Sequence, residues 1–210
     1  MKKIYKFLLI CALKFSNFLY KLISFLAIRA EGGIHPKHRL LGYHEFFTNN
    51  ILCTDSVLDI GCGNGALSYD IAGKAKSVVG IDIEQKNIKE AIKRHSRPNL
   101  KYVVGDATKD LSGDKFDVIT LSNVLEHIEH RVLFLKGIKG ISAKYLIRVP
   151  TFDRDWIPLY KKELGLEWRL DLTHFTEFTK KTFYKEVEEA GYRIESFNVQ
   201  FGEIWAVVKP

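Results

Sequence analysis

The chain has 210 residues, of which 46% are hydrophobic and 27% charged, so it is long and apolar enough for a packed core, and global disorder is excluded. Its three cysteines form no Cys-x-x-Cys pair, which excludes a disulfide scaffold and a structural zinc knuckle and is typical of the reducing cytoplasm. Residues 1–30 hold six cationic side chains and no acid, so the remaining 180 residues have a net charge of only +1, which disfavours a nucleic acid partner.

The first thirty residues form a segment of their own, rich in Ile, Leu, Phe, Tyr and Ala. Three lysines interrupt it, so no apolar run reaches the roughly 18 residues that a membrane-spanning helix needs. On a helical wheel the polar positions form a stripe roughly 80° wide, made of Lys3, Lys6, Lys14, Asn17, Lys21 and Ser24. We therefore expect residues 1–32 to form a basic amphipathic helix on an anionic membrane surface, with a cytoplasmic protein held peripherally at its inner face. The alternatives are a helix packed on the body, a hydrophobic partner surface and a cleaved signal peptide.

After a break at Gly32–Gly33, apolar strand-like runs alternate with helical stretches. Strands are expected over 57–60, 77–81, 100–104, 116–121, 145–149, 192–198 and 204–208. Helices are expected over 37–50, 66–72, 84–95, 124–139 and 179–190. This alternation predicts an α/β fold in residues 33–210, a Rossmann-like, doubly wound and mostly parallel seven-stranded sheet with one antiparallel strand. The segment 151–178 fits no regular element and is expected to form a substrate-side cap.

A glycine-rich loop joins the first strand to its helix and contains Gly61, Cys62, Gly63 and Gly65. Glycines there permit a tight turn and a close approach of a ligand to the backbone, which also fits a dinucleotide loop. Asp59, just before the loop, distinguishes a dinucleotide from S-adenosylmethionine as the ligand of this loop. Its carboxylate opposes an anionic pyrophosphate and favours the cationic S-adenosylmethionine, so a nicotinamide dehydrogenase is disfavoured.

The ends of the next three strands carry further candidate cofactor ligands, namely Asp82 with Ile83, Asp106 with Ala107, and Ser122 with Asn123. In open α/β sheets the ligand crevice lies at the carboxyl ends of the strands, where all of these residues are expected. A carboxylate after the second strand can accept hydrogen bonds from both ribose hydroxyls, and one after the third can accept from an adenine amino group. The competing interpretation is that either acid merely caps a helix.

This series of strand ends resembles the class I S-adenosylmethionine-dependent methyltransferases, in their small-molecule and ubiquinone-type branch. The resemblance covers roughly residues 37–150 by motif and 179–210 by the closing strands. It implies an enzyme whose cofactor is S-adenosyl-L-methionine. The glycine loop would hold the methionine part, Asp82 the ribose and Asp106 the adenine region.

The candidate acceptor residues follow the fourth strand, where Asn123, Glu126 and His127 share one helical face. The spacing resembles the Glu-x-x-Glu-His motif of ubiquinone-pathway O-methyltransferases and small-RNA 2′-O-methyltransferases, which binds a divalent metal. Here Asn123 replaces the first acid, and losing an anionic ligand weakens a hard cation, so no metal is expected. We expect Glu126, His127 and the later His174 to line the acceptor pocket, with His174 assisting deprotonation of a hydroxyl. The competing interpretation of Glu126 and His127 is a helix-start cap and a solvated face.

Arg154, Trp156 and Arg169, in the expected cap, offer cations and a stacking face for a sugar, a phosphate group or an aromatic ring. Equally, the segment could be a self-packed lid in which the arginines pair with neighbouring acids. The sequence therefore predicts methyl transfer, at oxygen, to a small molecule or to a membrane-associated lipid, glycan or quinone precursor. The alternatives are an RNA-end 2′-O-methyltransferase and a non-catalytic subunit with a cofactor fold.

Overall fold

The computed structural model describes residues 1–32, 35–111, 115–169 and 171–210, and these form two compact units, Met1–Tyr43 and His44–Pro210. Gly33 of the expected break lies outside the described residues. The first unit includes the short helix α2 (Lys37–Leu41) and ends at Tyr43, whose hydroxyl is hydrogen-bonded to the His38 ring of α2.

The first unit is dominated by the helix α1 (Lys2–Ala30). Its 29 residues span about 43 Å, more than the ~30 Å hydrocarbon core of a bilayer. By length and composition α1 is apolar enough to cross a membrane. The expectation that its lysines exclude such a helix was therefore wrong, although signal sequences and core helices of soluble proteins meet the same criterion.

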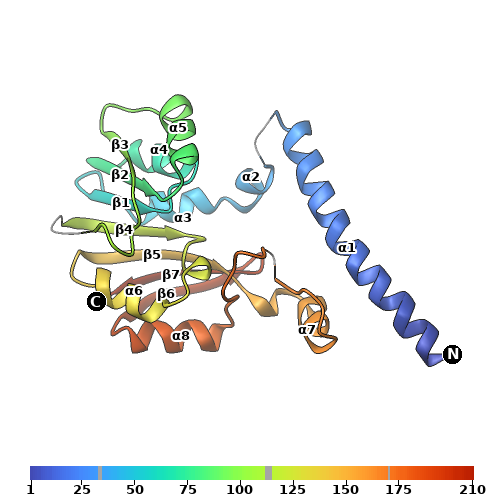
Figure 1. Cartoon of the computed structure of the whole chain (residues 1–210). Coiled ribbons are helices and arrows are strands. Elements are labelled where there is room, and N and C mark those ends of the chain that lie inside the picture. Colours follow the sequence, from blue (N-terminus) through green and yellow to red (C-terminus); the bar gives the residue numbers. More distant parts are fainter. Residues whose placement is uncertain (33–34, 112–114, 170) are drawn as a thin grey trace. The chain divides into compact units, whose positions relative to one another are not determined.

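The second unit is built on a seven-stranded sheet with the strand order β3-β2-β1-β4-β5-β7-β6, which can be followed in Figure 1. All neighbouring strands are parallel except β7, which is antiparallel to both β5 and β6. The predicted fold class is thereby confirmed. The strands are β1 (Ser56–Ile60), β2 (Ser77–Asp82), β3 (Leu100–Val104), β4 (Phe116–Ser122), β5 (Ser142–Pro150), β6 (Arg193–Gln200) and β7 (Glu203–Lys209).

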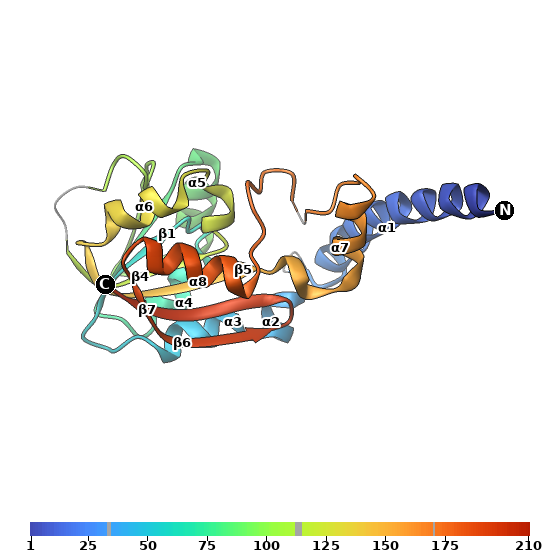
Figure 2. The same cartoon turned by 90° about the horizontal axis from the view of Figure 1, so that it is seen from below.

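Helices cover both faces of this sheet. The α-helices of the unit are α3 (Tyr43–Asn49), α4 (Ala66–Ala72), α5 (Gln85–Arg94), α6 (Arg131–Ile138), α7 (Trp156–Glu163) and α8 (Lys180–Glu189), with single 3-10 turns at η1 (Leu125–His127) and η2 (Phe152–Arg154). α6 and α8 lie side by side on one face (Figure 2) and bury Phe134 and Phe183 against the strands. On the other face Phe46 of α3 packs on Trp205 of β7, with ring centroids 5.5 Å apart.

The expected cap, residues 151–178, has regular structure after all, because it contains η2 and the helix α7. Asp155 caps α7 by accepting a hydrogen bond from the Ile157 N–H at 3.3 Å. The two ends of the segment are pinned together, since the Phe152 N–H donates to the Phe178 carbonyl at 2.6 Å. The cap therefore leaves the sheet after β5 and returns to the same place before α8.

Candidate functional site

The glycine loop after β1 takes the conformation that its sequence predicts. Gly61, Gly63 and Gly65 all have φ between +54° and +80°, the left-handed region that favours glycine. A Cβ on Gly61 would lie 2.7 Å from the Val124 side chain, and one on Gly65 would lie 2.8 Å from the Cβ of Ala91. A Cβ on Gly63 would meet nothing within 4 Å, so the backbone there is open to a ligand.

A cleft of about 1140 Å³ lies at the carboxyl ends of β1 to β4. Of the residues predicted to bind the cofactor, it is lined by Gly61, Gly63, Asp82, Ile83, Asp106, Ala107 and Asn123. Its volume exceeds the range of about 300–1,000 Å³ typical of ligand sites, which leaves room for a cofactor and an acceptor together. Sequence reasoning missed other lining residues, among them Asn87, Thr108, Lys109, Leu111, Ile128 and Leu133. These sit in helices and loops without a motif that singles them out.

The two strand-end acids in the cleft have different surroundings. Asp82 is buried and accepts hydrogen bonds from the backbone N–H groups of Gly63 and Glu84, each at 2.8 Å, so it links the glycine loop to β2. Asp106 caps the turn that follows β3 and pairs with Lys109 at 2.8 Å. Hydrogen bonds from Lys109 and Thr108 hold the pKa of Asp106 at about 2, so its carboxylate is ionised and its oxygens face the cleft as acceptors.

Asp59 lies beneath the glycine loop and does not line the cleft. Its carboxylate accepts hydrogen bonds from the hydroxyls of Ser68, at 2.5 Å, and Thr120, at 2.6 Å. Burial raises the pKa of Asp59 to about 6, a shift that the two hydroxyls partly oppose. The structure therefore places Asp59 outside the lining of the cleft, where its carboxylate links β1 to α4 and β4.

Two more of the predicted residues lie behind the wall of the cleft. The Cys62 side chain is buried against Gly80, where a Cβ would lie 3.0 Å from its sulfur. The Ser122 hydroxyl accepts a hydrogen bond from Arg148 at 3.2 Å. Asn123, in contrast, lines the cleft with φ +57° and a buried side-chain carbonyl that has no hydrogen-bond partner among the described residues.

Glu126, His127 and His174 come together, as the sequence predicts, but of the three His127 lines the cleft, whereas Glu126 and His174 are buried and do not line it. One donor atom from each lies within 4.8 Å of the others, and the two imidazole rings meet edge to face at 4.6 Å between centroids. The backbone brings them there, because the Phe175 N–H donates to the Glu126 carbonyl at 2.8 Å. His127 faces the cleft, and burial together with the neighbouring His174 lowers its pKa.

Glu126 is fully buried, and neither of its carboxylate oxygens has a hydrogen-bond partner among the described residues. Burial raises its pKa to about 8. A buried carboxyl without partners is costly to a fold, typically by about 1–3 kcal/mol or more, and points to a missing ligand. Two imidazoles and a carboxylate are a donor set of catalytic zinc sites, so these three residues fit a divalent cation in spite of Asn123.

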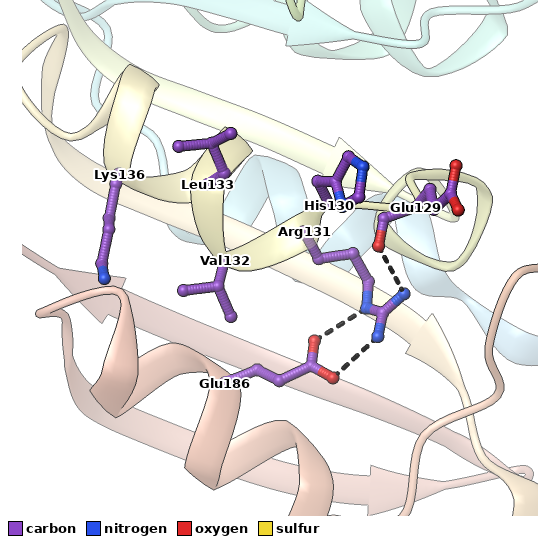
Figure 3. A pocket seen from close by; sticks show the side chains of 7 residues that line it. All are labelled: Glu129, His130, Arg131, Val132, Leu133, Lys136 and Glu186. Atoms are coloured by element: carbon purple, nitrogen blue, oxygen red, sulfur yellow. Dashed lines mark hydrogen bonds and ion pairs between the residues drawn. The ribbon is translucent and has the colours of Figure 1, made fainter.

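A smaller pocket of about 380 Å³ borders the cleft between α6 and α8 (Figure 3). Arg131 crosses it to Glu186, with one nitrogen–oxygen distance of 2.8 Å and another of 2.9 Å, and also donates to the Glu129 carbonyl. The bidentate pair with Glu186 occupies the Arg131 guanidinium, so these two side chains link α6 to α8. The pocket therefore does not extend the acceptor site.

The three residues predicted to bind substrate from the cap do not line the cleft. Arg154 pairs with the buried Glu177, and Arg169 pairs with Glu167 at 2.9 Å, as the alternative of a self-packed lid has it. Trp156 is 65% exposed on α7. Arg169 also donates to the His174 carbonyl at 3.1 Å, so both arginines support the loop that carries His174.

Comparison with known proteins places this geometry in a family. Residues 58–144 match a family described as a methyltransferase domain. The chain is 32% identical over 133 residues to the ubiquinone biosynthesis O-methyltransferase of Bartonella tribocorum, covering 59% of this chain and 54% of that protein. It is 42% identical over 91 residues to the protein of that name from Pelagibacter ubique, covering 42% and 38%. The chain thus spans about half the length of the curated relatives it matches.

The fold is also shared with solved structures. Magnesium protoporphyrin IX methyltransferase from Synechocystis, solved with bound S-adenosylhomocysteine, superposes with a TM-score of 0.63 at 17% identity over 81% of this chain and 80% of that one. Mitomycin 7-O-methyltransferase gives 0.64 at 16% identity, over 80% and 53%. Together with the glycine loop and the strand-end acids around the cleft, the methyltransferase-domain match and these relatives support a class I S-adenosylmethionine-dependent methyltransferase, and the solved structures show the same fold.

Proposed function

We propose that this protein transfers the methyl group of S-adenosylmethionine to a hydroxyl oxygen of a small molecule. One observation carries the proposal. His127 and Thr173, at the histidine cluster, line the same cleft as Gly63 and Asp82, which belong to the cofactor end. A cofactor held by the glycine loop would therefore share one cleft with the groups that can activate an acceptor.

The chemistry requires positioning and the removal of one proton. The acceptor oxygen attacks the methyl carbon in line, the carbon–sulfur bond breaks, and the sulfonium becomes a neutral thioether. The hydroxyl proton has to leave, and in the absence of a cation a histidine nitrogen of the cluster would accept it, whereas with both imidazoles bound to a cation the acidified hydroxyl would release it to water. A divalent cation held by Glu126, His127 and His174 would bind the hydroxyl and lower its pKa.

The acceptor proposed is a phenolic, quinone-type compound, which the similarity to ubiquinone O-methyltransferases supports. Incubation with methyl-labelled S-adenosylmethionine and a set of catechols, sugars and short RNAs tests this choice. Label on a catechol oxygen is expected. Label on a sugar or on the 2′-oxygen of RNA would replace the acceptor class, and label on none would leave a protein that only binds the cofactor.

Removal of divalent cations is expected to reduce methyl transfer at least tenfold, because the buried Glu126 carboxylate and two imidazoles would lose the ion that unites them. The measurement is turnover after treatment with a chelator, followed by addition of Zn²⁺, Co²⁺ or Mg²⁺. Zn²⁺ or Co²⁺ should restore activity at lower concentration than Mg²⁺, since imidazole ligands suit transition metals better. Full activity in the chelator would show that the cluster works without a metal.

We further propose that α1 holds the protein at an anionic membrane surface. Along this helix Lys3, Lys6, Lys14 and Lys21 form the polar stripe, and only Leu13 is buried. Large apolar side chains are exposed on it, including Phe7, Leu8, Phe15, Phe18, Ile23 and Phe25. Such a helix can place its apolar side in the acyl boundary while the lysines reach the headgroups.

We expect the full chain to sediment with phosphatidylglycerol vesicles, and the triple variant Lys6→Glu, Lys14→Glu, Lys21→Glu to lose most of this binding. Each lysine near such a surface contributes about 1 kcal/mol, so three reversed charges should weaken binding more than tenfold. A matched variant reverses the exposed Lys180, Lys181 and Lys185 of α8 and should sediment like the wild type. Equal sedimentation of both variants would remove the electrostatic anchor, and resistance to extraction at pH 11 would indicate a spanning helix.

A further inference from the structure

Both histidines of the cluster meet a cap residue at the same ring atom, Nδ1. We propose that Glu177 and Thr173 are positioning residues that keep the proton of each ring on Nδ1, Thr173 through a hydrogen bond to His127 and Glu177 through a carboxylate 3.5 Å from His174, so that both rings present the lone pair of Nε2 to Glu126. This inference rests on the proposed function in one respect only, namely that the cluster is where the acceptor is activated. It assigns the cap a task different from the substrate binding that its arginines and tryptophan led us to expect.

The arrangement at His174 starts from a fully buried acid. The Glu177 side chain has no exposed surface, and its Oε1 lies 3.5 Å from Nδ1 of His174, an ion-pair distance without hydrogen-bond geometry, while Nδ1 has no hydrogen-bond partner among the described residues. Its other oxygen, Oε2, accepts from the Arg154 guanidinium, which also donates to the Thr151 carbonyl at 2.8 Å. Arg154 thus fixes the carboxylate in the wall of the cap, and the carboxylate favours the proton of His174 on the nitrogen that faces it.

The arrangement at His127 uses a hydroxyl between the ring and an acid. The Thr173 hydroxyl lies 3.0 Å from Nδ1 of His127 and 2.9 Å from Oδ1 of Asp171. A hydroxyl has one proton, and the carboxylate can only accept it, so the hydroxyl donates to Asp171 and accepts from His127. The proton of His127 is thereby also placed on Nδ1.

The consequence is a matched pair of tautomers. A ring that donates from Nδ1 carries its lone pair on Nε2, and which nitrogen is free decides whether the histidine can bind a cation or take a proton in the cleft. Both holding residues come from the same short stretch, Asp171 to Glu177, which the Phe175 N–H fastens to the Glu126 carbonyl at 2.8 Å. One segment of the cap therefore sets the distance and the protonation of the whole cluster.

The substitution Glu177→Gln distinguishes the positioning role of Glu177 from a purely structural role as the partner of Arg154. The guanidinium has only donors, so the amide oxygen of the glutamine must face Arg154, and its NH₂ group then faces His174. Nδ1 of His174 would have to accept, which moves its proton to Nε2. The positioning role thus predicts an inverted tautomer, whereas a structural role predicts an unchanged one or a protein that does not fold.

The experiment is ¹⁵N nuclear magnetic resonance of the histidine rings in the full chain, treated with a chelator and measured with neutral imidazoles. We expect Nδ1–H tautomers for His127 and His174 in the wild type. Glu177→Gln should invert His174 alone, and Thr173→Val should abolish the preference of His127 alone. Glu195→Gln, which removes an exposed ion pair with Lys209 between β6 and β7, should leave both rings unchanged. Zinc affinity should fall about 10- to 100-fold in Glu177→Gln.

An Nε2–H tautomer of His174 in the wild type, or a wild-type His174 spectrum in a folded Glu177→Gln protein, would overturn the inference. If Glu177→Gln does not fold, Thr173→Val decides it, because an unchanged His127 tautomer there contradicts the same mechanism. Failure of the proposed function would look different. A protein with the expected tautomers that transfers no methyl group from S-adenosylmethionine would refute methyl transfer and leave the positioning intact.

Discussion

Replacing His174 by alanine is expected to lower turnover by about 10²- to 10⁴-fold while the affinity for S-adenosylmethionine stays within about twofold. His174 is buried against His127 and belongs to the cluster proposed to activate the acceptor, whereas the glycine loop, Asp82 and Asp106 lie at the proposed cofactor end of the cleft. The substitution should therefore affect kcat and leave cofactor binding unchanged.

The measurement combines steady-state turnover with calorimetric titration of the cofactor. His35→Ala is the matched control. His35 is hydrogen-bonded to Ser24 in the first unit, so this substitution should leave both the turnover and the cofactor affinity unchanged. Unchanged turnover in His174→Ala would show that the cluster does not serve the reaction. Lost cofactor affinity would place His174 in the cofactor site instead.

The second large effect concerns the buried Asp59. Burial raises its pKa from 3.8 to about 6 in the folded protein, so the unfolded chain ionises first as the pH rises. The folded state is consequently destabilised between about pH 4 and pH 6, and a shift of this size corresponds to about 3 kcal/mol. Asp59→Asn should remove this loss, because an amide can still bond to Ser68 and Thr120 without carrying a charge.

Denaturant unfolding of the cofactor-free protein from pH 4.5 to pH 7.5 measures this difference. Relative to the wild type, Asp59→Asn should gain stability as the pH rises through this range and then level off. Asp153→Asn, which alters an exposed acid, should follow the wild-type curve. Parallel curves for the wild type and Asp59→Asn would show that Asp59 does not titrate with a raised pKa.

Much of the cofactor site could be predicted because it depends on local sequence. Gly61, Gly63 and Gly65 need positive φ, and Asp82 and Asp106 follow strands whose apolar runs are easy to recognise. The prediction that the Asp59 side chain faces the cofactor was wrong, although the alternation of side chains along β1 indicates which face of the sheet it lies on. Leu58 and Ile60 belong to the core cluster under α6 and α8, so Asp59 between them must face the opposite side of the sheet, opposite Thr120 on β4.

The cap could not be predicted in the same way, because its contacts join residues far apart in the chain. Nothing near Arg154 in the sequence marks Glu177 as its partner, and the pairing forms only when Phe152 and Phe178 bring the ends of the cap together. The unpartnered carboxylate of Glu126 is also a property of packing. The sequence indicated that Glu126, His127 and His174 belong together, but not that a buried carboxyl without hydrogen-bond partners among them would favour a cation.

Calorimetric titration of the full chain with S-adenosylmethionine and with NAD⁺, repeated on Asp82→Ala, tests the central claim most directly. The geometry predicts one site for S-adenosylmethionine, no binding of NAD⁺, and at least tenfold weaker cofactor binding when the Asp82 carboxylate is removed. Binding of NAD⁺, or S-adenosylmethionine binding that does not depend on Asp82, would contradict the assignment of this cleft to a sulfonium methyl donor.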